Sequence, residues 1–468
     1  MGVTTRAPLA ALLFMVASGC GSDPVDPVPS GDPVVAIELP VEGQTVNRTF
    51  RVKASCAGGC RSLEAYKTWA HMSDQKVELA TGTTSIDREV SLGGLTGELH
   101  IAARADGKST SDYAEVTIYA MNAPDVTEVV RTPGPVLDFD GTRVLYSRQT
   151  PAGWQVLLGR GDPASDKVLR QGAGRPDHGV IVDPDLVLFT LWRNRIGPSI
   201  LGNYYDPTYP DTDSLYEWRS GTASLLSATS LTRRPIVEHG IAVWQEGVIS
   251  TSTWRSPERM PLQMRDLATG TTTTLSTASA SLGIDVGPGP SVAWADRVGD
   301  GQGAPTEIAW WRNGAVTRFS AQGASYMNPS TDGASVAFQT TDCCRFELQT
   351  PQGREILAEF LPASGQRWYD KYRVESGFVA WSRPGPGGLT HEVRLRRPDG
   401  TTTTVASSII AREPPTIRLL TGTGVLVYDD VLVRAGSGPR ALGSGDARVV
   451  ERDGSYFLVY GNAVYRVN

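Results

Sequence analysis

The chain has 468 residues and a net charge of −6, a balance that gives no electrostatic footprint for nucleic acid. Its 50 glycines and 31 prolines are spread along the whole length and leave little room for long helices. Threonine, valine and aromatic residues dominate the segments between them, which favours strands. The composition therefore predicts an all-β protein, long enough for two or three domains.

The first apolar segment is a short run that ends near a cysteine. Arg6 precedes the run 9–16, which is too short to span a bilayer but suits a secretory signal, and small residues then lead to Cys20. This arrangement resembles the lipobox of bacterial lipoproteins. The resemblance implies that residues 1–19 are a signal peptide and that Cys20 becomes an acylated N-terminus, carrying lipid such as palmitate. The alternative is an ordinary secretory signal that contains a cysteine.

Residues 20–32 combine this cysteine with a proline-rich segment that cannot bury a core, and we expect an extended spacer here. Gly21, and not an aspartate, follows Cys20, which in the enterobacterial sorting scheme favours the outer membrane. Beyond residue 20 no apolar stretch is long enough to cross a bilayer. The N-terminal region thus predicts a protein of the bacterial cell envelope whose contact with the membrane is its lipid.

Residues 33–122 show the pattern of a small β-sandwich. Thr49–Cys56 alternates apolar and polar residues with period two, and similar short runs follow between turn residues. The segment resembles the Ig-like modules of bacterial surface lipoproteins, although it lacks the Cys…Trp…Cys spacing of antibody domains. Cys56 and Cys60 flank a short flexible loop, so we expect them to form a disulfide.

Residues 123–468 contain an internal repeat of about 43 residues, the length of a propeller blade. Each copy has an extended run, a tight turn and a very apolar strand that ends in an aromatic residue, followed by further strands. The copies are Pro135–Tyr146, Val180–Phe189, Pro235–Trp244, Ile284–Trp294, Asn328–Phe338, Arg373–Trp381, Ile417–Tyr428 and Val449–Tyr460. This region loosely resembles WD40-like and TolB-like propellers, with Ser330–Gly333 approximating the TolB turn.

The two ends of the repeat region complement each other. The eighth copy supplies three strands before the chain stops, and Val126–Arg131 has the pattern of a lone fourth strand. Pairing them would close the ring and remove two exposed sheet edges. We therefore predict an Ig-like β-sandwich followed by an eight-bladed propeller, with seven blades as the alternative if one weak copy merges with its neighbour.

The candidate binding residues lie in long segments between the second and third strands of blades two to four. They are Tyr204, Tyr205, Asp206 and Tyr209 in the longest segment, Trp254 in the next, and Asp296 and Asp300 in the third. Loops rich in aromatic residues on a rigid frame suit recognition. The alternative is that they are insertions that pack on neighbouring blades.

The remaining reactive side chains do not form a recognisable catalytic or metal-binding motif. Cys343 and Cys344 are neighbours, and a vicinal disulfide and two free thiols are both open. His178 and His239 occupy corresponding strands of adjacent blades and could meet near the central channel, but two histidines without a third ligand favour a structural role. The segment Asp296–Gly303 misses the ligand spacing of a calcium loop. We assign no catalytic residue, metal or cofactor.

These observations lead to one functional expectation and one alternative. We expect a non-enzymatic binding or scaffold protein, held in the envelope by lipid, whose propeller recognises a protein or glycan partner. The alternative is a propeller enzyme of the lyase or lactonase type, which would act on a carbohydrate or lactone with a divalent metal.

Overall fold

The computed structural model describes residues 32–69, 72–93, 96–107, 110–193, 212–230, 235–246, 260–299, 304–319, 325–340, 345–359, 372–384, 390–409, 415–434, 437–443 and 447–468. These residues form strands and turns and no helix, so the all-β prediction is confirmed. Accordingly, no helix in this part of the chain could cross a membrane.

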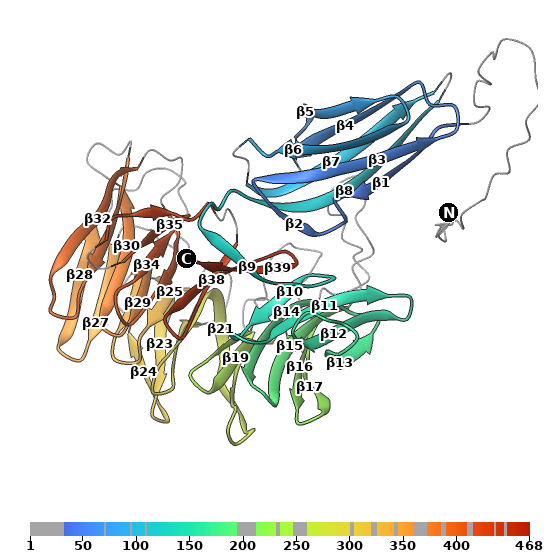
Figure 1. Ribbon diagram of the computed structural model, residues 1–468. Helices are drawn as coiled ribbons and strands as arrows, with labels where there is room; N and C mark the ends of the chain where they lie inside the picture. The colour runs from blue at the N-terminus through green and yellow to red at the C-terminus, as the bar shows by residue number, and fades with distance from the viewer. Residues whose placement is uncertain are drawn as a thin grey trace, which may run out of the picture.

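The N-terminal region is a two-layer sandwich (Figure 1). Its strands are β1 (Val34–Leu39), β2 (Gln44–Asn47), β3 (Thr49–Ala57), β4 (Ser62–Trp69), β5 (Met72–Gly82), β6 (Ser85–Ser91), β7 (Gly97–Asp106) and β8 (Ser111–Met121). The strands follow one hydrogen-bonded order, β1-β3-β2-β8-β7-β4-β5 with β6 beside β3, and a single residue pair, Asn47 with Thr49, connects the layer of β1, β3 and β6 to the layer of the other strands. Apolar residues of both layers share one core, which includes Val52, Ile86, Leu63 and Ile101. Its assignment to the Ig-like class stays a prediction.

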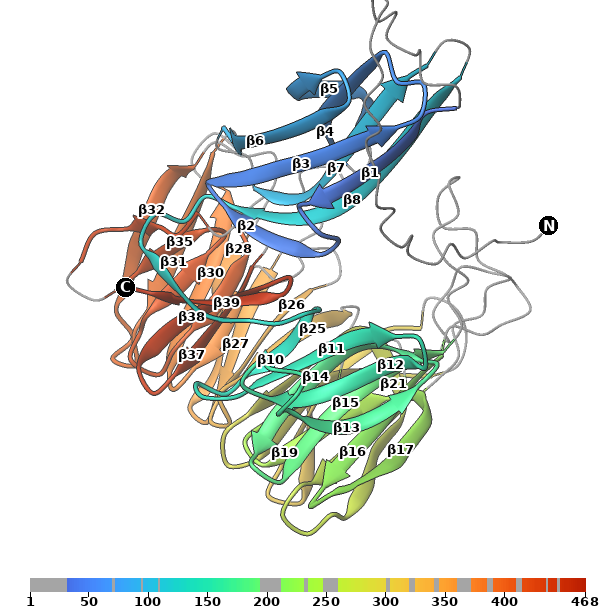
Figure 2. The ribbon, with the colours of Figure 1, turned by 45° about the vertical axis from the view of Figure 1, so that its right-hand side comes forward.

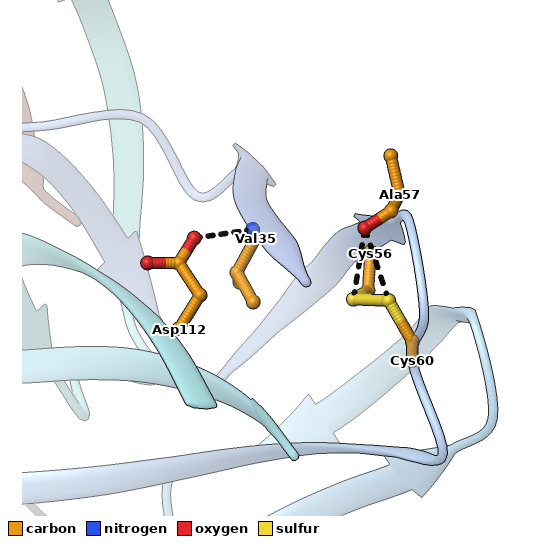
Figure 3. Close-up of a disulfide and its surroundings, with 5 residues drawn as sticks. All are labelled: Val35, Cys56, Ala57, Cys60 and Asp112. Atoms are coloured by element: carbon orange, nitrogen blue, oxygen red, sulfur yellow. Dashed lines mark hydrogen bonds between the residues drawn. A yellow bond between two sulfur atoms is a disulfide. The ribbon is translucent and has the colours of Figure 1, made fainter. Parts of the chain in front are cut away.

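A disulfide joins Cys56 at the end of β3 to Cys60, as the short loop between them predicts (Figure 3). Beside it, the backbone N–H of Val35 donates to the carboxylate of Asp112 at 2.8 Å (Figure 3). The two contacts fasten the end of the sandwich where the described chain begins.

After the sandwich come β9 (Val126–Arg131) and a series of four-stranded units. The first two units are β10 (Val136–Phe139), β11 (Val144–Thr150), β12 (Gly153–Gly159) and β13 (Lys167–Gly172), then β14 (Arg175–Asp183), β15 (Leu186–Arg193), β16 (Thr212–Arg219) and β17 (Thr222–Ser230). A seven-stranded sheet follows, formed by β18 (Ile236–Glu238), β19 (Ile241–Gln245), β20 (Met260–Asp266), β21 (Thr272–Gly287), β22 (Ser291–Arg297), β23 (Thr306–Arg312) and β24 (Ala315–Phe319). We count it as units three and four, because the long strand β21 is the last strand of one and the first strand of the other.

Units five to eight complete the series. They are β25 (Tyr326–Thr331), β26 (Val336–Thr340), β27 (Arg345–Thr350) and β28 (Gly353–Glu359); β29 (Tyr372–Glu375), β30 (Phe378–Pro384), β31 (His391–Arg396) and β32 (Thr402–Ile409); β33 (Ile417–Leu420), β34 (Leu426–Tyr428), β35 (Val431–Val433) and β36 (Arg440–Ala441); and β37 (Arg448–Arg452), β38 (Ser455–Tyr460), β39 (Ala463–Val467) and β9. The predicted closing pair is confirmed, because β9 runs antiparallel to β39 with Val126 opposite Val467 and Arg131 opposite Ala463. In Figures 1 and 2, β9 lies beside the last strands of the chain.

Hydrophobic clusters between consecutive units hold the series in a ring. One cluster fills the sandwich, and each of the other eight lies between two neighbouring units. The cluster between unit eight and unit one includes the rings of Phe139 and Phe457, with centroids 5.0 Å apart. Because the first and last units pack in the same way as the others, β9–β39 form a closed β-propeller.

The first strands of neighbouring units contact each other and form the inner wall of the ring. Side chains on these strands bond to the backbone of the next strand, and thereby form an inner girdle. The bonds join Asp138 Oδ2 to Ile181 N (2.9 Å), Asp285 Oδ2 to Thr331 N (2.8 Å), Ser330 Oγ to Val374 N (3.1 Å), Arg373 Nε to Ile417 O (3.1 Å), Arg418 Nη1 to Ala447 O (3.2 Å) and Arg448 Nη2 to Leu137 O (3.0 Å). The girdle therefore satisfies backbone groups that the inner edges of the sheets leave unpaired.

Asp138 is the girdle position where a substitution should have the largest effect. Its side chain is buried, and it also accepts a bond from Arg448 at 3.0 Å. We expect Asp138→Ala to lower the free energy of unfolding by about 2 kcal/mol, because it leaves the Ile181 N–H buried without a partner. Asp125→Ala is the control, since Asp125 is exposed and pairs with Arg440 at the surface. This control should cost under about 0.5 kcal/mol in a denaturant titration, and equal losses in the two variants would contradict the girdle's role.

Candidate functional site

Ionisable side chains lie on the inner strands of the ring: Glu238 on β18, Asp285 on β21, Arg373 and Glu375 on β29, and Arg452 on β37. We call these five residues the axial cluster. Asp285, Glu375, Arg373 and Arg452 all shift the pKa of Glu238, the two acids upward and the two arginines downward. The charges that act on Glu238 thus come from carboxylates of units four and six and from guanidinium groups of units six and eight.

Glu238 is the unpaired member of the axial cluster. Solvent reaches its side chain, and it forms no hydrogen bond or ion pair with any residue that the structure describes. The protein around its remaining sides desolvates the carboxylate and, with the negative charge of Asp285, raises its pKa to about 7. Arg373 and Arg452 oppose this shift without cancelling it.

Unlike Glu238, Asp285 is fixed by a hydrogen bond, because its Oδ2 accepts from the Thr331 N–H. Burial raises the pKa of its carboxyl, while the positive charge of Arg373 and the Thr331 N–H act in the opposite direction. Arg373 bonds to the Ile417 carbonyl through Nε, and its side chain is exposed. A carboxyl group that titrates near neutrality beside a solvent-exposed guanidinium can exchange protons and bind a polar ligand.

Glu238, Glu375 and Arg452 are not among the site residues expected from the sequence, although the sequence carries a signal for them. Each stands immediately before a turn dipeptide that ends in glycine: His239-Gly240, Ser376-Gly377 and Asp453-Gly454. At this position the first and fifth copies have Phe139 and Thr331, and the second copy has Asp183.

The histidines that the sequence analysis considered do not form a metal site in the structure. His178 lies in β14, and His239 lies in the turn after β18 with a φ of 51°. Among the described residues, no group of three or more His, Cys, Asp or Glu side chains is arranged to hold a metal ion.

Asp296 requires a correction. Its side chain is buried, accepts a bond from Ser276 Oγ at 2.7 Å and pairs with Arg318 Nη1 at 2.7 Å. Arg318 also pairs with Glu307. Asp296 therefore connects strands inside the ring and is not an accessible binding residue, contrary to the prediction from its place at the start of a long segment.

The other candidate binding residues lie outside the described residues: Tyr204, Tyr205, Asp206, Tyr209, Trp254 and Asp300, together with Cys20, Cys343 and Cys344. The structure does describe the strand ends on either side of the two longest segments, 194–211 and 247–259. Arg193 is paired with Thr212, and the Glu246 N–H bonds to the Pro261 carbonyl at 2.8 Å. Both segments join a second strand to a third, so they leave the ring on the same face as the turn at Gly461 and Asn462. We call this side the loop face.

No family model and no curated protein matches the chain. Similar solved structures include the β-propeller domain of the Trilobed protease from Pyrococcus furiosus (9% identity, 66% of this chain and 95% of that chain, TM-score 0.34). A quinoprotein alcohol dehydrogenase-like protein from Bacteroides thetaiotaomicron is 7% identical over 79% of this chain and 96% of that chain, with a TM-score of 0.30. The acylaminoacyl peptidase of Pyrococcus horikoshii is 10% identical, with a TM-score of 0.36, and the match covers 86% of this chain but 59% of the peptidase. At these values the likeness carries no argument about activity.

The raised pKa of Glu238 makes the stability of the ring depend on pH. Because the pKa is about 7 in the folded chain against an ordinary value of 4.5, the folded state holds the proton more tightly. The stability that the protonated Glu238 side chain contributes to the folded state is complete below its ordinary pKa of 4.5, and it is lost as the pH rises to about 7. Glu238→Gln keeps the neutral form, so its unfolding free energy should exceed that of the wild type at pH 8 and approach it at pH 4. Denaturant titrations across this range test the prediction, and a difference that does not vary with pH would contradict it.

Proposed function

We propose that this protein is a lipid-anchored scaffold of the bacterial cell envelope, and that the loop face of its propeller binds a protein or glycan partner. Cys20 would carry the lipid and residues 21–32 would span the distance from the outer membrane. The ring would then be a rigid frame for the segments that contain Tyr204, Tyr205 and Trp254.

The observation that carries the proposal is the docking of the sandwich on the loop face. Thr45 of β2 bonds to Asn462 and Tyr460 of the last unit, and the rings of Tyr119 and Tyr460 meet edge-on with centroids 5.2 Å apart. These contacts fix the sandwich against the ring, and the sandwich follows directly on the spacer. The sandwich and the ring would then move as one rigid body at the end of the tether, which suits an anchored receptor.

The strand pairings also support a rigid base for the loops. The β15–β16 hairpin is paired in register from Leu186 opposite Arg219 to Arg193 opposite Thr212. The segment between its strands therefore starts and ends at adjacent backbone positions. Tyrosine and tryptophan side chains on such a base bury large areas at a low cost in side-chain entropy.

Site-specific photo-crosslinking in membranes tests the proposal. A photoreactive residue at Tyr205 or Trp254 of the full-length, lipid-modified chain should give one discrete crosslinked product. The same residue at Asn313 is the matched control, because Asn313 lies in an exposed turn between β23 and β24 on the opposite face. Digestion of the product with proteases or glycosidases identifies the class of partner. Absence of a product at both loop positions, or equal products at Asn313, would contradict the proposal.

The alternative function, an enzyme that acts on a carbohydrate or lactone, has one observation in its favour. The axial cluster sets Glu238, with a pKa of about 7, near the guanidinium groups of Arg373 and Arg452. Such a carboxyl could serve as a general acid or base, a role that contributes about 100-fold or more in rate.

A substrate panel separates the two functions. Our proposal predicts no turnover of lactones or acidic polysaccharides by the purified chain, with or without added divalent metal. Turnover that falls about 100-fold in Glu238→Gln would establish the alternative instead. Glu375→Gln is the comparison variant, since Glu375 occupies the corresponding position in unit six and also accepts a bond from Ser376.

A further inference from the structure

Thr45 of the sandwich is bound by the propeller through every polar group that it has. Its N–H donates to Asn462 Oδ1 at 2.9 Å, its hydroxyl donates to the Tyr460 carbonyl at 2.7 Å, and its carbonyl accepts from Arg131 Nη1 at 2.9 Å. The side chain is 1% exposed. These bonds satisfy Thr45 at the edge of β2 that faces away from β8, where β2 pairs with β3 only at Asn47.

Arg131 and Asn462 are also the residues that hold the closing pair of the ring. Arg131 is the last residue of β9, and it additionally donates to the Tyr465 hydroxyl of β39 at 3.1 Å. Asn462 forms the turn before β39, where its side-chain amide donates to the Thr132 carbonyl at 2.9 Å and its carbonyl accepts from the Thr132 N–H at 2.9 Å. The same side chains therefore bind the sandwich, the start of β39 and the end of β9.

The other end of β9 is fixed to the sandwich as well. The short segment 122–125 joins it to β8, and Asn47 of β2 bonds to both the N–H and the carbonyl of Ala123, at 3.0 and 2.9 Å. The Asn122 N–H bonds to the Gly443 carbonyl of unit seven at 2.8 Å. Both ends of β9 thus depend on the position of β2.

The strand between these ends contributes little burial of its own. Most residues of β9 are exposed or half-exposed, and Val129 is 46% exposed. A strand with few buried apolar contacts separates easily from its neighbour unless its ends are held. The sandwich also packs closely on the turn between β38 and β39, because a Cβ at Gly461 would lie 2.5 Å from Thr45 Oγ1 and 2.5 Å from the Tyr119 ring.

From these contacts we infer that the sandwich is the latch of the propeller: β9 leaves β39 only when β2 leaves the ring, so undocking of the sandwich and opening of the ring between units eight and one are one event. The latch gives the chain a route by which force or a ligand acting on the sandwich opens the ring. This inference is independent of the proposed function, since it concerns the joint alone.

Hydrogen exchange measured by mass spectrometry on the full chain tests the latch. Thr45→Val keeps the shape of the side chain and removes its hydroxyl. We expect exchange about tenfold faster in peptides that cover β9 and β39 as well as β2, with the other units unchanged. Thr306→Val is the matched control, because Thr306 is a buried threonine whose hydroxyl donates to the Tyr326 carbonyl between units four and five, at 2.5 Å. It should leave β9 and β39 protected.

Two further measurements keep the test decisive if Thr45→Val folds poorly. In Gly461→Ala the added methyl group presses on Thr45 and Tyr119, and the φ of 54° strains the turn as well, so the latch predicts that β2 loses protection together with β9 and β39. In the wild type, exchange of β2, β9 and β39 under increasing denaturant should converge on one opening free energy. Faster exchange in β2 with β9 and β39 unchanged, or separate openings in the wild type, would overturn the inference.

Discussion

The pairing of β9 with β39 is the constraint on which the rest of the propeller depends. Residues separated by most of the chain meet there, with Thr127 opposite Arg466. Without this pair, unit eight would expose the outer edge of β39 to solvent, which invites pairing with other chains. The apolar cluster between units eight and one, including Phe139 and Phe457, packs beside the closing pair.

Ring closure also explains why charge collects at the axis. The inner edges of the sheets need partners for their backbone groups, and polar side chains such as Asp138 and Asp285 supply them. Arginines supply the remaining partners in units six to eight, as Arg373 and Arg418 do. Glu238 lies on the same inner wall but has no such bond, so the environment acts on its pKa without fixing its side chain.

The sequence predicts most of this fold because each unit repeats the same local pattern. Alternation and turn residues locate the strands, and the lone pattern at Val126–Arg131 predicts the closing pair. The docking of Thr45 on Asn462 was not predictable in this way, since it joins two residues 417 positions apart in the sequence through a single turn. The prediction for Asp296 was wrong for a related reason. Its place before a long segment suggested that a ligand could reach it, whereas its side chain is buried and forms an ion pair with Arg318 inside the ring.

Cysteines introduced in the closing strands test the closed ring most directly. In an antiparallel pair, opposite Cα atoms lie about 4.5–5.5 Å apart, within the range of a disulfide. Thr127→Cys with Arg466→Cys should therefore form a disulfide in the folded chain, and Thr127→Cys with Ser455→Cys, one strand further away, should not. Peptide mapping distinguishes the two. A chain that leaves the first pair reduced under oxidising conditions, or that links both pairs equally, would contradict the closed ring.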